Sequence, residues 1–187
     1  MKKNDTIVRL LVVGVGNVLQ GDDGFGVELA NRLMARTDIP ENVKLMETGI
    51  GGMSLVQELM YGYDALLILD AYKNDGEPGR LYLLEPLLPD LSHLKPHELR
   101  DYFSDTHYAT PMRALHFLER VGELPKVVNI VGCEPEEIDD MKLGLSETVI
   151  AAIPQAEKMV IEWINRYLQA TAYSANPDTE IVSQQLI

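Results

Sequence analysis

The chain has 187 residues, and its 46% hydrophobic and 24% charged residues are typical of a globular domain rather than a disordered chain. Sixteen Lys and Arg against 29 Asp and Glu give a net charge of −13, which opposes binding to nucleic acid and to anionic membrane surfaces. The single cysteine, Cys133, excludes an internal disulfide and a cysteine-based zinc finger. We expect a cytoplasmic protein without a signal peptide or a membrane span.

Apolar strands alternate with amphipathic helices along the chain. In the first half, the pattern predicts a strand at Ile7–Val15, a helix at Gly26–Arg36, a strand at Val43–Glu47, a helix at Met53–Met60 and a strand at Ala65–Asp70. In the second half it predicts an edge or antiparallel strand at Arg80–Glu85, a helix at Pro111–Glu119, a strand at Lys126–Cys133 and a helix that starts after Ser146 and runs to about Leu168, bent near Pro154.

This alternation predicts a three-layer α/β/α sandwich with a twisted, mostly parallel sheet. We expect one domain over residues 1–169 and a flexible tail at 170–187, where hydrophobic periodicity is lost. The first helix is expected to bury one apolar face, formed by Val27, Ala30, Leu33 and Met34.

A glycine-rich loop follows the first strand and contains Asp22 and Asp23. It does not match the dinucleotide fingerprint, because Leu19 stands where the third glycine is required. Two interpretations remain for the aspartates. They cap the following helix, or the glycines bring a carboxylate to the carboxyl edge of the sheet, where open α/β folds bind ligands.

Asp70 favours the second interpretation, because it ends an apolar strand and is therefore expected at the same edge as Asp23. A histidine is the expected third member of the site. His107 precedes the helix that begins near Pro111, which starts at this edge if the next strand is parallel to the first two. His97 is the alternative, because it also lies in a loop.

The other two histidines are weaker choices, since His93 has no nearby anchor and His116 lies inside a helix, where a packing or surface role is expected. Two carboxylates and one imidazole suit zinc, nickel, manganese or iron. The same three groups without a metal can act as general acid and base.

Several linked motifs resemble those of the nickel-iron hydrogenase maturation proteases. The first loop, Gly14-x-Gly16-Asn17-x-Leu19-x-x-Asp22-Asp23-x-x-Gly26, resembles the family's signature. The resemblance continues in order through Thr48–Met53, Leu69–Ala71, Gly76–Gly79, Gly122–Pro125, Val131–Glu136 and Gly144–Ser146.

The resemblance implies a phosphorylase/hydrolase-like twisted sheet and an endopeptidase that removes a C-terminal extension from the hydrogenase large-subunit precursor after nickel insertion. It implies that Asp23, Asp70 and His107 contact the metal, and that Asp23 and Asp70 carry an aspartic-type or metal-assisted cleavage. The implied cofactor is nickel carried by the substrate, with no organic cofactor, and the implied oligomeric state is a monomer.

Three features depart from the family's pattern. Many members have Glu where Asp23 stands, the Leu87–Asp105 segment is expanded and adds His97, and Cys133 is interpreted as strand-end packing. Two other functions stay open at this point. One is a different metal hydrolase that acts on small peptides or phosphoesters, and the other is a non-catalytic chaperone that holds the large subunit.

Overall fold

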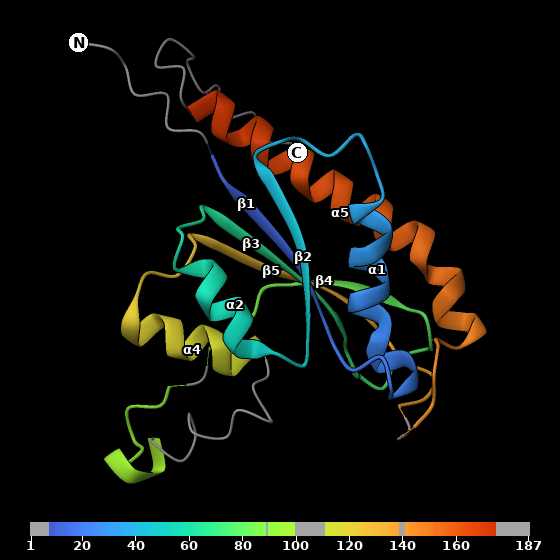
Figure 1. Cartoon of the computed structure of the whole chain (residues 1–187), viewed down its shortest axis with the longest axis horizontal. Coiled ribbons are helices and arrows are strands. Elements are labelled where there is room, and N and C mark those ends of the chain that lie inside the picture. Colours follow the sequence, from blue (N-terminus) through green and yellow to red (C-terminus); the bar gives the residue numbers. More distant parts are fainter. Residues whose placement is uncertain (1–7, 89, 100–110, 139–140, 175–187) are drawn as a thin grey trace, which may run out of the picture.

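One five-stranded sheet with helices on both faces organises the protein (Figure 1). The computed structural model describes residues 8–88, 90–99, 111–138 and 141–174. Its elements are, in chain order, β1 (Leu10–Val15), the short 3-10 helix η1 (Gly21–Gly24), α1 (Phe25–Met34), β2 (Val43–Gly49), α2 (Gly52–Leu59), β3 (Ala65–Ala71), β4 (Leu81–Leu84), α4 (Pro111–Val121), β5 (Val127–Cys133) and α5 (Glu147–Ser174).

The strands lie in the order β2-β1-β3-β5-β4, and the first four are parallel. Every residue of β1 is buried, as expected for a near-continuous apolar strand covered on both faces. Strand β4 lies at the edge and pairs antiparallel with β5, with Leu81 opposite Cys133. The predicted mostly parallel α/β sheet and its antiparallel edge strand are therefore confirmed.

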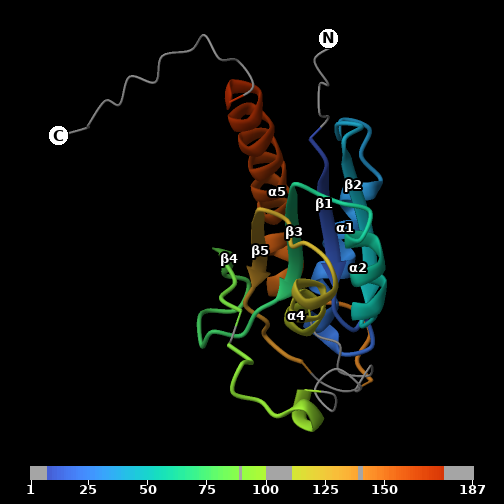
Figure 2. The same ribbon diagram turned by 90° about the vertical axis from the view of Figure 1, so that its left-hand side faces the viewer.

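Helices α1 and α5 cover one face of the sheet, and α2 and α4 cover the other (Figure 2). The side chains of β3 alternate between the two cores. Leu67 and Leu69 pack with α1 and α5, whereas Leu66 and Ile68 pack with α2 and α4. This alternation assigns the next residue, Asp70, to the α2–α4 side.

Two predictions about the helices are corrected. Met34, the last residue of α1, is 40% exposed instead of buried with Val27, Ala30 and Leu33. Helix α5 continues to Ser174, past the predicted end near Leu168, because an established helix adds residues without needing an apolar face. Residues 170–174, expected in the tail, are thus helical, and residues 175–187 lie outside the described part of the chain.

None of the helices that the structure describes has both the length and the apolar character needed to cross a bilayer.

Candidate functional site

The first loop is folded tightly onto the carboxyl edge of the sheet. Gly16 has a φ of 126°, and a Cβ at this position would lie 1.9 Å from the carbonyl oxygen of Asp23. A Cβ at Gly26 would lie 2.0 Å from the carbonyl oxygen of Leu69. Both positions require glycine, and the close contacts at Gly26 bring the start of α1 directly onto the end of β3.

Asp23 lies in η1 and is partly exposed. Its Oδ2 accepts a hydrogen bond of 2.7 Å from the backbone N–H of Asn17, on the other side of the loop. The adjacent residue Gly16 donates its N–H to the carbonyl of Gly49, which joins this loop to the glycine turn after β2. The structure therefore places Asp23 at the carboxyl edge of the sheet, as predicted.

Asp70 lies next to the last residue of β3 and is half-buried. Burial, followed by the charge of Asp23, raises the pKa of Asp70 to about 7, against a smaller lowering by the N–H of Ala71. The structure thus brings Asp23 and Asp70 into electrostatic contact at one edge of the sheet. A carboxyl group that titrates near neutrality is suited to proton transfer in either direction.

The third predicted residue, His107, lies outside the described residues, which omit 100–110. The premise behind that choice is confirmed, since β5 is parallel to β3 and follows α4, which places the first residue of α4, Pro111, at the carboxyl edge. His97, the alternative, is exposed in a short helical segment.

Neither of the other histidines has the character of a site residue. His93 is exposed. His116 is 2% exposed inside α4, and its Nδ1 lies 3.7 Å from Glu119 Oε2, which agrees with a packing role. Within the described part of the chain, no group of three or more His, Cys, Asp and Glu side chains is placed to hold a metal ion.

Asp22 has a role that the sequence reasoning missed. It is 1% exposed, and its carboxylate accepts hydrogen bonds from the backbone N–H groups of Glu136 (2.9 Å), Glu137 (3.1 Å) and Ser146 (2.6 Å) and from the Ser146 hydroxyl (2.9 Å). Burial raises the pKa of Asp22, but these hydrogen bonds outweigh it and hold the pKa below its ordinary value.

The interpretation of Asp22 as a cap of the following helix is therefore wrong. Asp22 binds the residue before α5, 124 positions away, whereas α1 has Gly24 as its N-cap and no side-chain cap. No signal in the sequence distinguishes Asp22 from Asp23, because the partners of Asp22 are backbone groups of a distant segment.

A second buried carboxylate, Glu134, organises the turn that follows Asp70. It is 2% exposed and accepts hydrogen bonds from the N–H of Asn74 (2.9 Å) and the hydroxyl of Tyr82 (2.8 Å). Burial opposes its ionisation, but these bonds lower the pKa of Glu134 below its ordinary value. In the sequence, Glu134 stands out only as part of the Val131–Glu136 motif that resembles the family.

Cys133 is 1% exposed, at the end of β5. Burial, with smaller effects from the charges of Asp22 and Glu134, raises the pKa of its thiol to about 12. The thiol is therefore protonated at neutral pH, and the interpretation of Cys133 as a packing residue rather than a nucleophile is confirmed.

Comparisons with known proteins show the family and the fold of this chain. The family model described as hydrogenase maturation protease matches residues 27–163. Hydrogenase 2 maturation protease from Escherichia coli (strain K12) is 34% identical over 158 residues, which cover 82% of this chain and 89% of the relative.

Two solved structures show the same fold. The hydrogenase maturating endopeptidase HybD from E. coli superposes with a TM-score of 0.68 at 30% identity, over 86% of this chain and 94% of the other. The hydrogenase 2 maturation peptidase from Thaumarchaeota archaeon SCGC_AB-539-E09 superposes with a TM-score of 0.61 at 31% identity, over 84% and 98%. The chain belongs to the hydrogenase maturation protease family.

Proposed function

We propose that this protein is an endopeptidase that removes the C-terminal extension of the nickel-iron hydrogenase large-subunit precursor after nickel has been inserted. The observation that carries the proposal is the pairing of Asp23 with Asp70, whose pKa is raised to about 7, at the carboxyl edge of the sheet. Family membership supports the substrate class.

The paired carboxyl groups provide for both proton transfers of peptide hydrolysis. An ionised carboxylate takes a proton from the attacking water, and a protonated carboxyl donates one to the leaving amine. Two interacting carboxyl groups favour a state in which one holds a proton and the other does not, as in aspartic-type enzymes. In the free protein, before nickel competes for this carboxyl group, the raised pKa of Asp70 makes it the proton holder of the pair.

Nickel enters as part of the substrate. Asp23 and Asp70, together with His107, offer two oxygen donors and one nitrogen donor to nickel held by the precursor. Carboxylates bind a metal ion in their ionised form, so nickel competes with the proton on Asp70. Cleavage then depends on nickel, because the metal ion completes the contact between precursor and protease.

The test is to incubate the protein with the folded precursor, with and without inserted nickel, and to follow the intact mass. Loss of one C-terminal peptide from the nickel-loaded form alone supports both parts of the proposal. Cleavage of both forms would keep the protease and overturn nickel recognition. A stable complex without a change in mass would instead indicate a chaperone.

The same assay tests the residues. Asp23→Asn and Asp70→Asn are expected to abolish cleavage, whereas Asp38→Asn, a control on the surface, is expected to cleave normally. Normal cleavage by either site variant would refute its assigned role. We further propose that the protein acts as a cytoplasmic monomer, which light scattering on the free protein and cell fractionation would test.

A further inference from the structure

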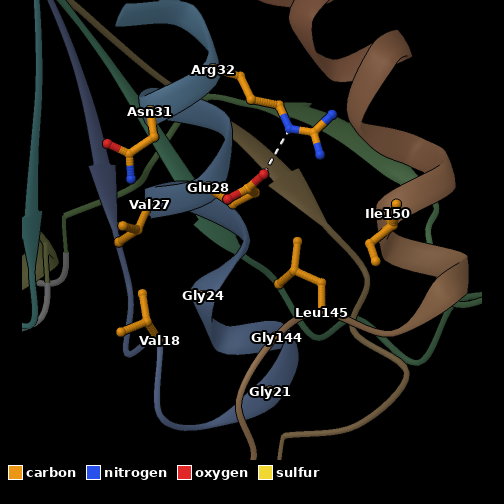
Figure 3. A pocket seen from close by; sticks show the side chains of 10 residues that line it. All are labelled: Val18, Gly21, Gly24, Val27, Glu28, Asn31, Arg32, Gly144, Leu145 and Ile150. Atoms are coloured by element: carbon orange, nitrogen blue, oxygen red, sulfur yellow. Dashed lines mark hydrogen bonds and ion pairs between the residues drawn. The ribbon is translucent and has the colours of Figure 1, made fainter. Parts of the chain in front are cut away.

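An open groove of about 300 Å³ lies beside the acidic site, on the α1–α5 side of the first loop (Figure 3). One wall is formed by η1 and α1, with Gly24 and Val27, and the other by Leu145 and Ile150. An ion pair of 2.7 Å between Glu28 and Arg32 lies at its rim. A cavity of about 150 Å³ holds a benzene ring, so this groove has room for two aliphatic side chains.

Exposed apolar side chains stand on both walls of the groove. Val18 (48% exposed) and Ile150 (46%) line it together with Val27 and Leu145. Met141 (85%) and Leu143 (76%) are exposed just before Gly144, which also lines the groove. An apolar surface of this kind with a charged rim is typical of protein–protein contacts.

The walls of the groove are held together by the first loop itself. Ser146 donates its N–H to Asp22, and Gly21 donates its N–H to the carbonyl of Lys142 at 2.8 Å. The groove is thus preformed, which reduces the entropy lost when it is filled.

The same short helix, η1, serves both the groove and the acidic site. Asp22 accepts a hydrogen bond from Ser146, just before α5, whereas Asp23 accepts one from Asn17 and acts on the pKa of Asp70. Gly24 lines the groove and directly follows Asp23, so a polypeptide bound at the acidic site needs only a few residues of extended backbone to reach the groove.

We propose that this groove binds an apolar segment of the large-subunit precursor next to its cleavage site, and that it contributes to substrate affinity rather than to the chemical step. The proposal rests on the proposed function, because the occupant is that substrate. The protein's own C-terminal segment is a poorer occupant. Helix α5 starts at the groove and over 28 residues carries the chain about 40 Å away, to Ser174 at the other end of the molecule (Figure 1).

The test compares KM and kcat for cleavage of the nickel-loaded precursor by the wild type, by Ile150→Asp, at a residue that lines the groove, and by Leu143→Asp, at the exposed residue before the lining glycine Gly144. Both side chains are exposed and outside the acidic site, so the variants are expected to fold, which thermal unfolding checks. Met60→Asp is the matched control, because Met60 is 65% exposed just after α2, at the opposite edge of the sheet. We expect KM to rise about tenfold in both groove variants, with kcat unchanged, and no change in the control.

The outcomes separate the two proposals. No cleavage by the wild type would overturn the proposed function. Normal cleavage by the wild type with unchanged KM in both groove variants would overturn the groove alone. A wild-type dimer that becomes a monomer in Ile150→Asp, measured by light scattering, would assign the groove to a second copy of the chain and also overturn the proposal.

Discussion

Asp22 and Asp23 are adjacent and chemically identical, but the structure gives them different tasks, and a pair of substitutions separates them. Asp22→Ala removes a buried acceptor of three backbone N–H groups and one hydroxyl. We predict that this variant loses much of its stability, whereas Asp23→Asn keeps its stability and loses its activity.

The magnitude follows from the hydrogen bonds that are broken. A hydrogen bond to a charged group contributes about 1.5–3 kcal/mol net, and leaving a buried donor unpaired costs about 1–3 kcal/mol. The four contributions are not additive, because the 136–146 segment relaxes and admits water once the carboxylate is gone. We therefore expect a loss of about 3–5 kcal/mol in the free energy of unfolding, against about 5–15 kcal/mol for a typical domain.

The assay is urea unfolding at pH 7, with Asp23→Asn as the matched control. The Asn oxygen in this control still accepts the N–H of Asn17, so we expect a change of less than about 1 kcal/mol. The folded-state pKa of Asp22 is lowered, so its stabilisation is present above the unfolded pKa of about 3.9 and is lost as the pH falls through the folded value. The difference between wild type and Asp22→Ala should therefore shrink below about pH 4.

Equal stability of Asp22→Ala and the wild type at pH 7 would refute the assignment of Asp22 as the link between the first loop and α5. A difference that does not change with pH would refute its electrostatic basis. If Asp23→Asn instead lost several kcal/mol, the division of tasks between the two aspartates would be wrong.

Three further predictions concern other buried groups. The pKa of Asp70 is raised to about 7, so between about pH 4 and pH 7 the folded state holds a proton that the unfolded state releases, and stability falls as the pH rises through this range. Asp70→Asn should therefore raise the free energy of unfolding at pH 7.5, by on the order of 1–4 kcal/mol, and leave it nearly unchanged at pH 3.5. Equal effects at both pH values in urea unfolding would contradict the raised pKa. Glu134→Gln should lower the melting temperature, because a neutral amide replaces the charged acceptor of the Asn74 and Tyr82 hydrogen bonds. The exposed control Glu41→Gln should melt like the wild type. Equal melting temperatures of the two variants would contradict the role of Glu134 in organising the turn after Asp70. The buried Thr48 hydroxyl has no hydrogen-bond partner among the described residues, so Thr48→Val should keep or raise the melting temperature, and a clear decrease in calorimetry would show that the hydroxyl is bonded.

Local pattern was sufficient for most of the fold. The apolar runs that form β1 and β3 predict central strands because only strands covered on both faces are apolar at successive positions. Local pattern was weaker at helix ends. The extension of α5 to Ser174 depends on helix propagation, which leaves no apolar periodicity in the sequence.

The sequence by itself determined which chemical groups are available at the carboxyl edge. Strand β1 leads into the loop that bears Asp22 and Asp23, and strand β3 ends near Asp70. Because the two strands are parallel, these carboxyl groups lie at the same edge of the sheet. Only the tertiary structure decided what each carboxyl group does. Asp22 is a structural acceptor because Ser146, 124 residues away, packs against it, and Asp70 titrates near neutrality because the surrounding chain removes water while Asp23 adds charge. Burial and long-range hydrogen bonds set these properties, and neither is encoded in the spacing of residues along the chain.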